Sequence, residues 1–358
     1  MHLDRMRLSN FRVYENFETD FSKSLNVITG DNGVGKSTIL EAVYYLSLTK
    51  SFRSNKDDDV VRFNSDFFMS TGTFISDNGV DDTILVSFSR DTGKSVKSQG
   101  KKVSRYSDIV GRHSIVMLSP EDMLATLSSP SGHRRFMNLT ISQVNSSHLN
   151  KLVSYRTLLR QRNSAIGLAA SGNRSDEETL DVIEEQLGEL CNSIISDRND
   201  FIEKISPEFE TIFSALNEGK KEGTIAYNPS MRGNKEELLR LFRERRSSDY
   251  ESGYTVRGPH RDSLSFNIDG RQLKKFGSKG ENKIFLVALK LAQGNYTAEI
   301  SGVKPIYLLD DIFMELDRSR ALKTMEYINN VGQVIITTTD FEEWSELVDT
   351  DVNIIGLS

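Results

Sequence analysis

The sequence has little that would support disulfide bonding or membrane insertion. Cys191 is the only cysteine among 358 residues, so the chain can form no internal disulfide and no zinc site built from several thiolates. No apolar run approaches the roughly 18 residues that span a bilayer, and the charged start at residues 1–7 is unlike a secretory leader. The sequence therefore predicts a cytoplasmic protein without membrane contact.

The chain also lacks a strong net charge of either sign. The 45 Lys and Arg residues face 51 Asp and Glu residues, which gives a net charge of −6, so any nucleic-acid contact must use a local basic patch. With 37% hydrophobic and 27% charged residues, the composition is that of a globular protein and excludes a disordered or collagen-like chain. At roughly 150 residues per domain, the length predicts two to three folding units.

A glycine-rich loop near the N-terminus carries the strongest motif. It follows the apolar run Leu25–Thr29 and precedes a segment of good helix formers, so the order is strand, loop, helix. The loop matches G-x-x-x-x-G-K-[ST], in which backbone N–H groups wrap a phosphate chain, and it reads Gly30-Asp31-Asn32-Gly33-Val34-Gly35-Lys36-Ser37-Thr38. Lys36 would reach the β- and γ-phosphates of ATP, and Ser37 would bind Mg²⁺. The complete match disfavours the alternative of a plain glycine turn before a helix.

An acidic strand end is the expected partner of this loop. The apolar run Pro305–Leu309 predicts a buried strand that delivers Asp310 and Asp311 to the edge of a sheet. Asp310 would hold Mg²⁺, and Asp311 would lie next to the attacking water. The alternative is that both aspartates only cap the following turn.

The placement of these motifs resembles the ATP-binding-cassette heads of the structural-maintenance-of-chromosomes and Rad fifty ATPases, and among them the bacterial recombination mediators. The resemblance covers most of the chain and rests on Leu8-Ser9-Asn10-Phe11-Arg12, Lys50-Ser51-Phe52-Arg53, Ser119-Pro120-Glu121-Asp122, Tyr155 with Gln161-Arg162-Asn163, Gly258-Pro259-His260-Arg261-Asp262 and 308–317. It implies an α/β fold, a cassette-type phosphate-loop ATPase head with an inserted, largely helical second lobe. Residues 1–119 and 290–358 would form lobe I, and residues 120–289 would form lobe II with a short helical hairpin and a signature motif.

The signature of such heads contacts the nucleotide of the opposite subunit in an ATP-bound dimer. Here it would be Ser278-Lys279-Gly280-Glu281-Asn282, in which Ser278 can cap a helix and Gly280 lets N–H groups approach a γ-phosphate. The family usually has glutamine at positions 279, 281 and 282, so Glu281 adds a negative charge near the incoming phosphate. An ordinary capped helix is the alternative. The family pattern also places the loop of Glu315, Leu316 and Asp317 at the face of the other subunit.

The resemblance implies an ATP-dependent DNA-binding protein of recombinational repair and replication restart. Its ATP-bound homodimer would clamp DNA at single-strand gaps, help RecR and RecO to load the recombinase RecA, and support the SOS response. The resemblance also implies at most a slow, DNA-stimulated ATPase. Asp311 stands where many cassette ATPases have a glutamate that orients water, and its side chain is one methylene shorter. No histidine follows His260, which argues against a transporter subunit. Two alternatives stay open, a scaffold that binds only proteins and a DNA end-processing ATPase.

Two further patterns concern DNA and the second lobe. Two groups of cations could neutralise the phosphates of double-stranded or gapped DNA without reading its sequence. The first group is Lys94, Lys97, Lys101, Lys102 and Arg105, together with Arg53. The second lies between Asp122 and Asp176, a stretch with no acidic residue and seven cations: Arg134, Arg135, Lys151, Arg156, Arg160, Arg162 and Arg174. A helical stripe at Ile183, Leu187, Leu190, Ile194 and Phe201 predicts a hairpin with the preceding helix. Two core helices are favoured over a partner-binding coiled coil, because sustained heptads are absent.

Strands are expected in eight further segments. They are Leu3–Leu8, Phe17–Phe21, Phe68–Ile75, Thr83–Ser89, Ile115–Leu118, the region of Tyr254, Leu264–Ile268 and Val334–Thr337.

Overall fold

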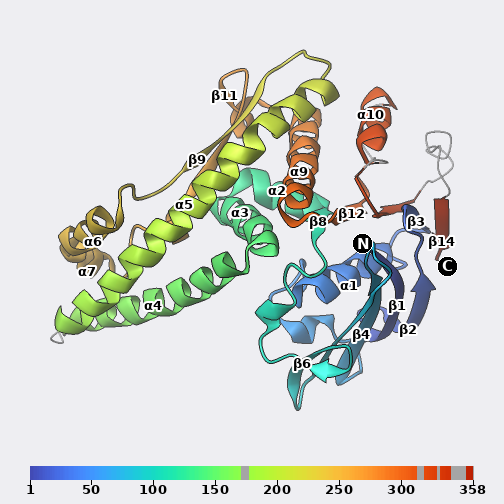
Figure 1. Cartoon of the computed structure of the whole chain (residues 1–358), viewed down its shortest axis with the longest axis horizontal. Coiled ribbons are helices and arrows are strands. Elements are labelled where there is room, and N and C mark those ends of the chain that lie inside the picture. Colours follow the sequence, from blue (N-terminus) through green and yellow to red (C-terminus); the bar gives the residue numbers. More distant parts are fainter. Residues whose placement is uncertain (171–176, 313–317, 329–330, 340–351, 358) are drawn as a thin grey trace. The chain divides into compact units, whose positions relative to one another are not determined.

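The computed structural model describes residues 1–170, 177–312, 318–328, 331–339 and 352–357. The chain forms two compact units (Figure 1). The first unit comprises Met1–Leu124, Glu208–Glu222 and Gly277–Ser358, and the second comprises Ala125–Pro207 and Gly223–Phe276. None of the helices within the described ranges is long and apolar enough to cross a membrane.

An antiparallel sheet of six strands forms one layer of the first unit, in the order β2-β1-β4-β5-β6-β7. The strands are β1 (His2–Phe11), β2 (Tyr14–Asp20), β4 (Phe67–Ile75), β5 (Asp81–Ser89), β6 (Gly93–Ser98) and β7 (Lys101–Lys102), with the short helices η1 (Asp57–Val60) and η2 (Tyr106–Asp108) beside them. Alternation along β4 buries Phe68 and Phe74 and exposes Phe67 and Met69, so one face of the sheet joins the core. The strands expected at 3–8, 17–21, 68–75 and 83–89 are confirmed.

The hairpin of β6 and β7 was not expected, because its lysines and serines give no apolar alternation. Its turn at Gln99 and Gly100 has φ values of 50° and 73°, the left-handed pair that a two-residue hairpin turn needs. Register across the hairpin places Lys97 directly opposite Lys102.

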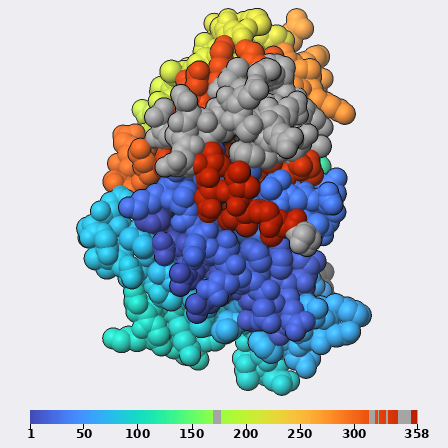
Figure 2. Space-filling model, turned by 90° about the vertical axis from the view of Figure 1, so that its right-hand side faces the viewer, coloured from blue at the N-terminus to red at the C-terminus, as the bar shows by residue number. Residues whose placement is uncertain are grey.

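A parallel sheet forms the centre of the first unit, in the order β14-β3-β13-β12-β8. The strands are β3 (Leu25–Thr29), β8 (Ile115–Leu118), β12 (Ile306–Asp310), β13 (Val334–Thr338) and β14 (Val352–Gly356), and the accompanying helices are α1 (Lys36–Leu48), α9 (Lys279–Ser301) and α10 (Arg318–Ile328). The strands β8, β12 and β13 are buried throughout, as expected of a parallel sheet covered on both faces. Strand β14 has no counterpart among the sequence predictions; Figure 2 shows its deep red residues against the dark blue N-terminal strands.

Register in this sheet brings the two chemical motifs to one edge. Thr29 at the end of β3 pairs with Thr338, and Thr337 pairs with Asp310 at the end of β12. Because these strands are parallel, the loop that follows β3 and the aspartates that end β12 meet at the carboxyl edge of the sheet. Sequence positions 30 and 310 thus reach the same edge of the sheet, with strand β13 between them.

The second unit is mainly helical. Its helices are the last turn of α2 (Pro120–Ser128), then α3 (Pro130–Val144), α4 (Ser146–Ala170), the first part of α5 (Glu177–Leu216), α6 (Lys235–Glu244), α7 (Arg246–Ser252), η3 (Pro259–Arg261) and α8 (Leu273–Phe276). A three-stranded sheet of β9 (Gly223–Asn228), β10 (Ser263–Ile268) and β11 (Arg271–Gln272) accompanies them. Helices α4 and α5 form the expected hairpin, whose core includes Leu152, Tyr155, Leu187, Cys191 and Ile194. The predicted stripe on α5 is confirmed.

The units divide the chain differently from the expected lobes. Residues 208–222 and 277–289, assigned from the sequence to lobe II, lie in the first unit. The reason is aromatic packing, because Phe209 and Phe213 on the last part of α5 contact Phe285 of α9 at ring distances of 4.5 and 5.4 Å. Asp122 at the start of α2 also pairs with Lys290 of α9.

The strand expected near Tyr254 is wrong. Thr255 donates its backbone N–H to Asn163 Oδ1, and Val256 donates to Asp249 Oδ1. Side chains of the helices thus take the hydrogen bonds that a sheet would need, and this segment becomes a loop.

Candidate nucleotide site

The glycine-rich loop of the first unit has the backbone that phosphate binding requires. Gly33 and Gly35 have φ values of 87° and 104°, a region that residues with a Cβ rarely adopt. A Cβ on Gly35 would also lie 2.8 Å from the Tyr14 hydroxyl. Helix α1 starts directly after Gly35, and no side chain caps its first turn. The first N–H groups of α1 are therefore available to an anion.

Lys36 is held over this loop. Its ammonium donates to the carbonyl oxygens of Gly30 and Asp31 at 2.7 and 3.0 Å, and the residue is only 5% exposed. A buried ammonium that bonds only carbonyl oxygens keeps its full charge for a phosphate group. Ser37 and Thr38 follow in the first turn of α1.

The acidic strand end is fixed by a threonine on the neighbouring strand. Thr337 donates its hydroxyl to Asp310 Oδ1 at 2.7 Å and accepts the backbone N–H of Asp311 at 3.1 Å. Asp311 takes the left-handed conformation, with a φ of 48°, which turns the chain out of β12. The sequence predicts Thr337 only as the last residue of a strand; its positioning role follows from the register of β12 and β13.

Asp311 has a buried carboxylate oxygen without a partner. Within the described residues, no group donates a hydrogen bond to its Oδ1. Burial raises the pKa of Asp311, the charge of Asp310 raises it further, and the ammonium groups of Lys36 and Lys283 oppose the rise. A buried acceptor of this kind, facing the phosphate-loop lysine, suits a water molecule held for reaction or a metal-bound water.

The oxygen donors at this edge fit Mg²⁺ that arrives with a nucleotide. They are the Ser37 hydroxyl and the carboxylates of Asp310 and Asp311, all hard ligands. Mg²⁺ is usually held by one or two carboxylates together with phosphate oxygens and water. The part of the chain that the structure describes contains no cluster of three or more His, Cys, Asp or Glu side chains able to hold a metal.

A buried glutamate connects the N-terminal motifs to this edge. Glu41 of α1 is fully buried and accepts hydrogen bonds from the Arg12 guanidinium at 2.6 and 3.0 Å and from the Ser51 hydroxyl. The Arg53 guanidinium lies 3.9 Å from Glu41 and 4.0 Å from Asp310. Arg53, which the sequence analysis groups with the DNA-binding cations, thus lies beside Asp310 at the candidate nucleotide site. Glu41 was missed because nothing distinguishes it from a surface residue of a helix.

The signature turn, residues 278–282, begins helix α9 as predicted. Ser278 is the N-cap and forms a capping box with Glu281, in which each side chain accepts the other residue's backbone N–H. Glu281 also pairs with Lys221. Ser278 and Gly280 thus have the backbone arrangement expected of a signature, and their contact with a nucleotide stays a prediction.

Comparison with known proteins decides the family. Residues 2–355 match the model of the RecF/RecN/SMC N-terminal domain. The DNA replication and repair protein RecF of Chlorobium phaeobacteroides strain BS1 is 34% identical over 354 residues, which cover 96% of this chain and 97% of that protein. The chain belongs to the RecF family. RecF of Clostridium acetobutylicum is 32% identical, and the alignment covers 100% of this chain and 98% of that protein.

RecF structures confirm the predicted fold class. The structure of the recombination mediator protein RecF-ATPrS in the RecFOR pathway has a TM-score of 0.89 and 26% identity, and covers 100% of this chain and 97% of its own. The RecF-ATP structure from the same pathway has a TM-score of 0.88 and 27% identity, and covers 98% and 93%. An Smc head bound to the winged-helix domain of ScpA shares the fold at a TM-score of 0.58 and 16% identity, and covers 100% and 94%.

Several cations that the sequence analysis assigns to a DNA surface form contacts inside this RecF family member instead. Lys94 donates to the Thr49 carbonyl oxygen and pairs with Asp57, Arg162 is fully buried, and Lys151 pairs with Asp197. These three assignments are corrected, because each charge is already used inside its own unit. Exposed cations that remain are Lys97, Lys101, Lys102 and Arg105 around the β6–β7 hairpin, and Arg135, Arg156 and Arg160 in the second unit.

The Gly258–Asp262 segment of the RecF pattern is structural in the second unit. Buried Asp262 accepts hydrogen bonds from Arg198 at 2.6 Å, from the Tyr227 hydroxyl and from the backbone N–H of Ser230. His260 bonds the Tyr155 hydroxyl at 2.6 Å. The family positions Met314, Glu315, Leu316 and Asp317 and the basic Arg174 lie outside the described residues.

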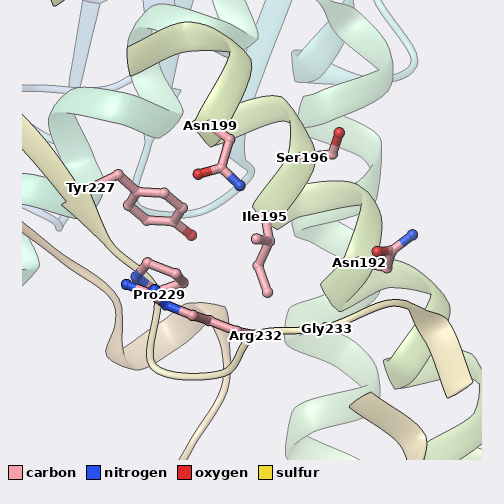
Figure 3. A pocket seen from close by; sticks show the side chains of 8 residues that line it. All are labelled: Asn192, Ile195, Ser196, Asn199, Tyr227, Pro229, Arg232 and Gly233. Carbon is pink, nitrogen blue, oxygen red and sulfur yellow. The ribbon is translucent and has the colours of Figure 1, made fainter. Parts of the chain in front are cut away.

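A pocket of about 470 Å³ lies beside α5 in the second unit (Figure 3). Ile195 points into it, and the Asn199 amide faces Tyr227. The rest of the wall consists of the exposed residues Asn192, Ser196, Arg232 and Gly233 and the half-buried Pro229. It contains none of the nucleotide-site residues.

Proposed function

We propose that this chain is a cytoplasmic, ATP-dependent DNA-binding protein of replication and recombinational repair. ATP with Mg²⁺ binds at the phosphate loop of one copy and is capped by the signature turn of a second copy. The ATP-joined homodimer holds DNA at single-strand gaps and works with RecR and RecO to load RecA in gap repair and the SOS response. Hydrolysis, slow at most, ends the clamped state by removing the γ-phosphate that joins the copies.

The observation that carries this proposal is the meeting of Lys36 with Asp310 and Asp311 at one sheet edge. Lys36 supplies a held positive charge, Asp310 is oriented by Thr337, and Asp311 keeps an unpaired buried oxygen. This set supplies the positive charge and the carboxylate oxygens that a magnesium nucleotide needs. Relatives named DNA replication and repair protein RecF, and RecF structures named with ATP and the RecFOR pathway, support the same assignment.

For the DNA contact, the β6–β7 hairpin is the strongest candidate surface. Lys97 and Lys102 stand directly opposite each other, an arrangement of like charges that destabilises a hairpin in the absence of an anion. Lys101 and Arg105 lie close in sequence and are exposed. The residues offer phosphate contacts rather than base contacts, so the proposed binding is independent of DNA sequence.

Replacing Lys97 and Lys102 together by alanine is expected to weaken binding of gapped duplex DNA in the presence of Mg·ATP. Two lost phosphate contacts should lower the affinity at least about tenfold and reduce the slope of log affinity against log salt by about 2. The measurement is a fluorescence-anisotropy titration at several NaCl concentrations.

The matched control is Lys23→Ala with Lys275→Ala, which removes two exposed lysines elsewhere. An unchanged affinity and salt slope for the hairpin variant would refute this surface. Absence of DNA binding by the unmodified protein, with ATP present, would favour instead a scaffold that binds protein partners only.

A further inference from the structure

The signature turn carries a charge that its proposed ligand would repel. Glu281 stands three residues after the capping Ser278, so a γ-phosphate that approached this turn would meet a carboxylate. Lys221 and the Ser278 N–H lower the pKa of Glu281 to about 2, which keeps the carboxylate ionised at neutral pH. The turn therefore needs a means to offset this charge.

Both oxygens of the Glu281 carboxylate are engaged within the first unit. Oε1 lies 2.5 Å from the Lys221 ammonium, and Oε2 accepts the Ser278 backbone N–H at 2.7 Å. The Ser278 hydroxyl accepts the Glu281 backbone N–H at 3.2 Å and is also within hydrogen-bonding reach of the Glu281 carboxylate, whose pKa this contact helps to lower. On the Gly280 side, the Arg320 guanidinium lies 3.3 Å from the position that a Cβ would take. Cations thus stand on both sides of the turn.

We propose that Lys221 is a positioning residue of the signature turn. It draws the Glu281 carboxylate into the ion pair and cancels its charge, so that Ser278 and Gly280 can face the γ-phosphate of ATP bound to a second copy. The inference rests on the proposed function, and it names the residue that allows an acidic signature to accept a polyphosphate.

A purely structural role for this ion pair predicts a different pattern of effects. Lys221 is 39% exposed, and ion pairs at such positions contribute little to folding. Its removal should therefore leave the melting temperature nearly unchanged. A Glu281 carboxylate without its lysine would instead repel the γ-phosphate and weaken the ATP-dependent dimer. Salt screens this repulsion.

The experiment compares the unmodified chain with Lys221→Met, Glu281→Gln and the double variant. Glutamine can keep the capping box, so Glu281→Gln removes the charge and preserves the helix start. Dimer dissociation constants are measured by sedimentation with Mg·ATP at 50 and 500 mM NaCl, together with the ATP affinity of the monomer and the melting temperature. Lys220→Met, which removes the neighbouring lysine paired with Glu218, is the control.

Lys221→Met should weaken the ATP-dependent dimer about tenfold at low salt, the effect of one uncompensated charge near a phosphate. The double variant should recover the dimer affinity of the unmodified chain, and Lys220→Met should dimerise as the unmodified chain does. At 500 mM NaCl, the difference in dimer affinity between Lys221→Met and the unmodified chain should become smaller. A Lys221→Met dimer as strong as the unmodified one, or no recovery in the double variant, overturns the inference while the proposed function stands. If no protein dimerises with ATP, the proposed function fails and the inference fails with it.

Discussion

Lys36→Met is expected to lower the affinity for Mg·ATP about 100-fold or more. Methionine keeps the length and the apolar stem of lysine but removes the ammonium that the Gly30 and Asp31 carbonyl oxygens hold over the loop. Charge-assisted hydrogen bonds to phosphate each contribute about 1.5–3 kcal/mol, and losing two of them exceeds a 100-fold change. Titration of the protein with a fluorescent ATP analogue measures the loss.

A second lysine of the first unit gives the control for this substitution. Lys23 is exposed and lies outside the phosphate loop, so Lys23→Met should bind ATP as the unmodified protein does. Equal ATP affinity of Lys36→Met and Lys23→Met would mean that the phosphate loop does not bind the nucleotide.

Arg162→Met is expected to destabilise the second unit by about 3–5 kcal/mol, because it removes the cation that pairs with buried Asp249 and one of the two that pair with buried Glu184. The Arg162 guanidinium donates to Glu184 Oε1 at 2.9 Å and to Asp249 Oδ2 at 2.6 Å, and all three side chains are at most 3% exposed. Arg246 also pairs with Glu184 and with Asp181, each at 2.6 Å. Urea unfolding followed by far-ultraviolet circular dichroism reports the change.

Arg160 offers a matched control on the same helix. It is exposed two residues earlier on α4, and Arg160→Met should change the free energy of unfolding by less than about 0.5 kcal/mol. A loss of stability below about 1 kcal/mol for Arg162→Met would show that the buried network does not hold α4, α5 and α7 together.

The elements that sequence patterns predicted well are those in which local chemistry and tertiary context agree. Strand β3, the start of α1 and the capping by Ser278 follow from apolar runs, glycine spacing and cap preference within a few residues. Strand β14 and the β6–β7 hairpin were missed, because a strand stabilised by its neighbours needs no strong alternation of its own. The end of α5 was placed in the wrong unit for a similar reason, since the Phe209 and Phe213 contacts with Phe285 decide its partner.

The candidate site shows the same limit at the level of single side chains. Lys36, Asp310 and Asp311 could be predicted because their motifs are short and local. Glu41 and Thr337 could not be assigned their roles, because these depend on strand register and on arginines from distant segments. Charge alone also gave wrong predictions, since Lys94 and Arg162 were assigned to a DNA surface and are bonded to groups inside the protein.

Sedimentation velocity of the unmodified chain, with and without Mg·ATP, shows whether the nucleotide joins two copies. We expect a monomer without nucleotide and a dimer with Mg·ATP, while Lys36→Met stays monomeric in both conditions. A single species of unchanged mass with and without Mg·ATP, at a nucleotide concentration that saturates the phosphate loop, would contradict this expectation.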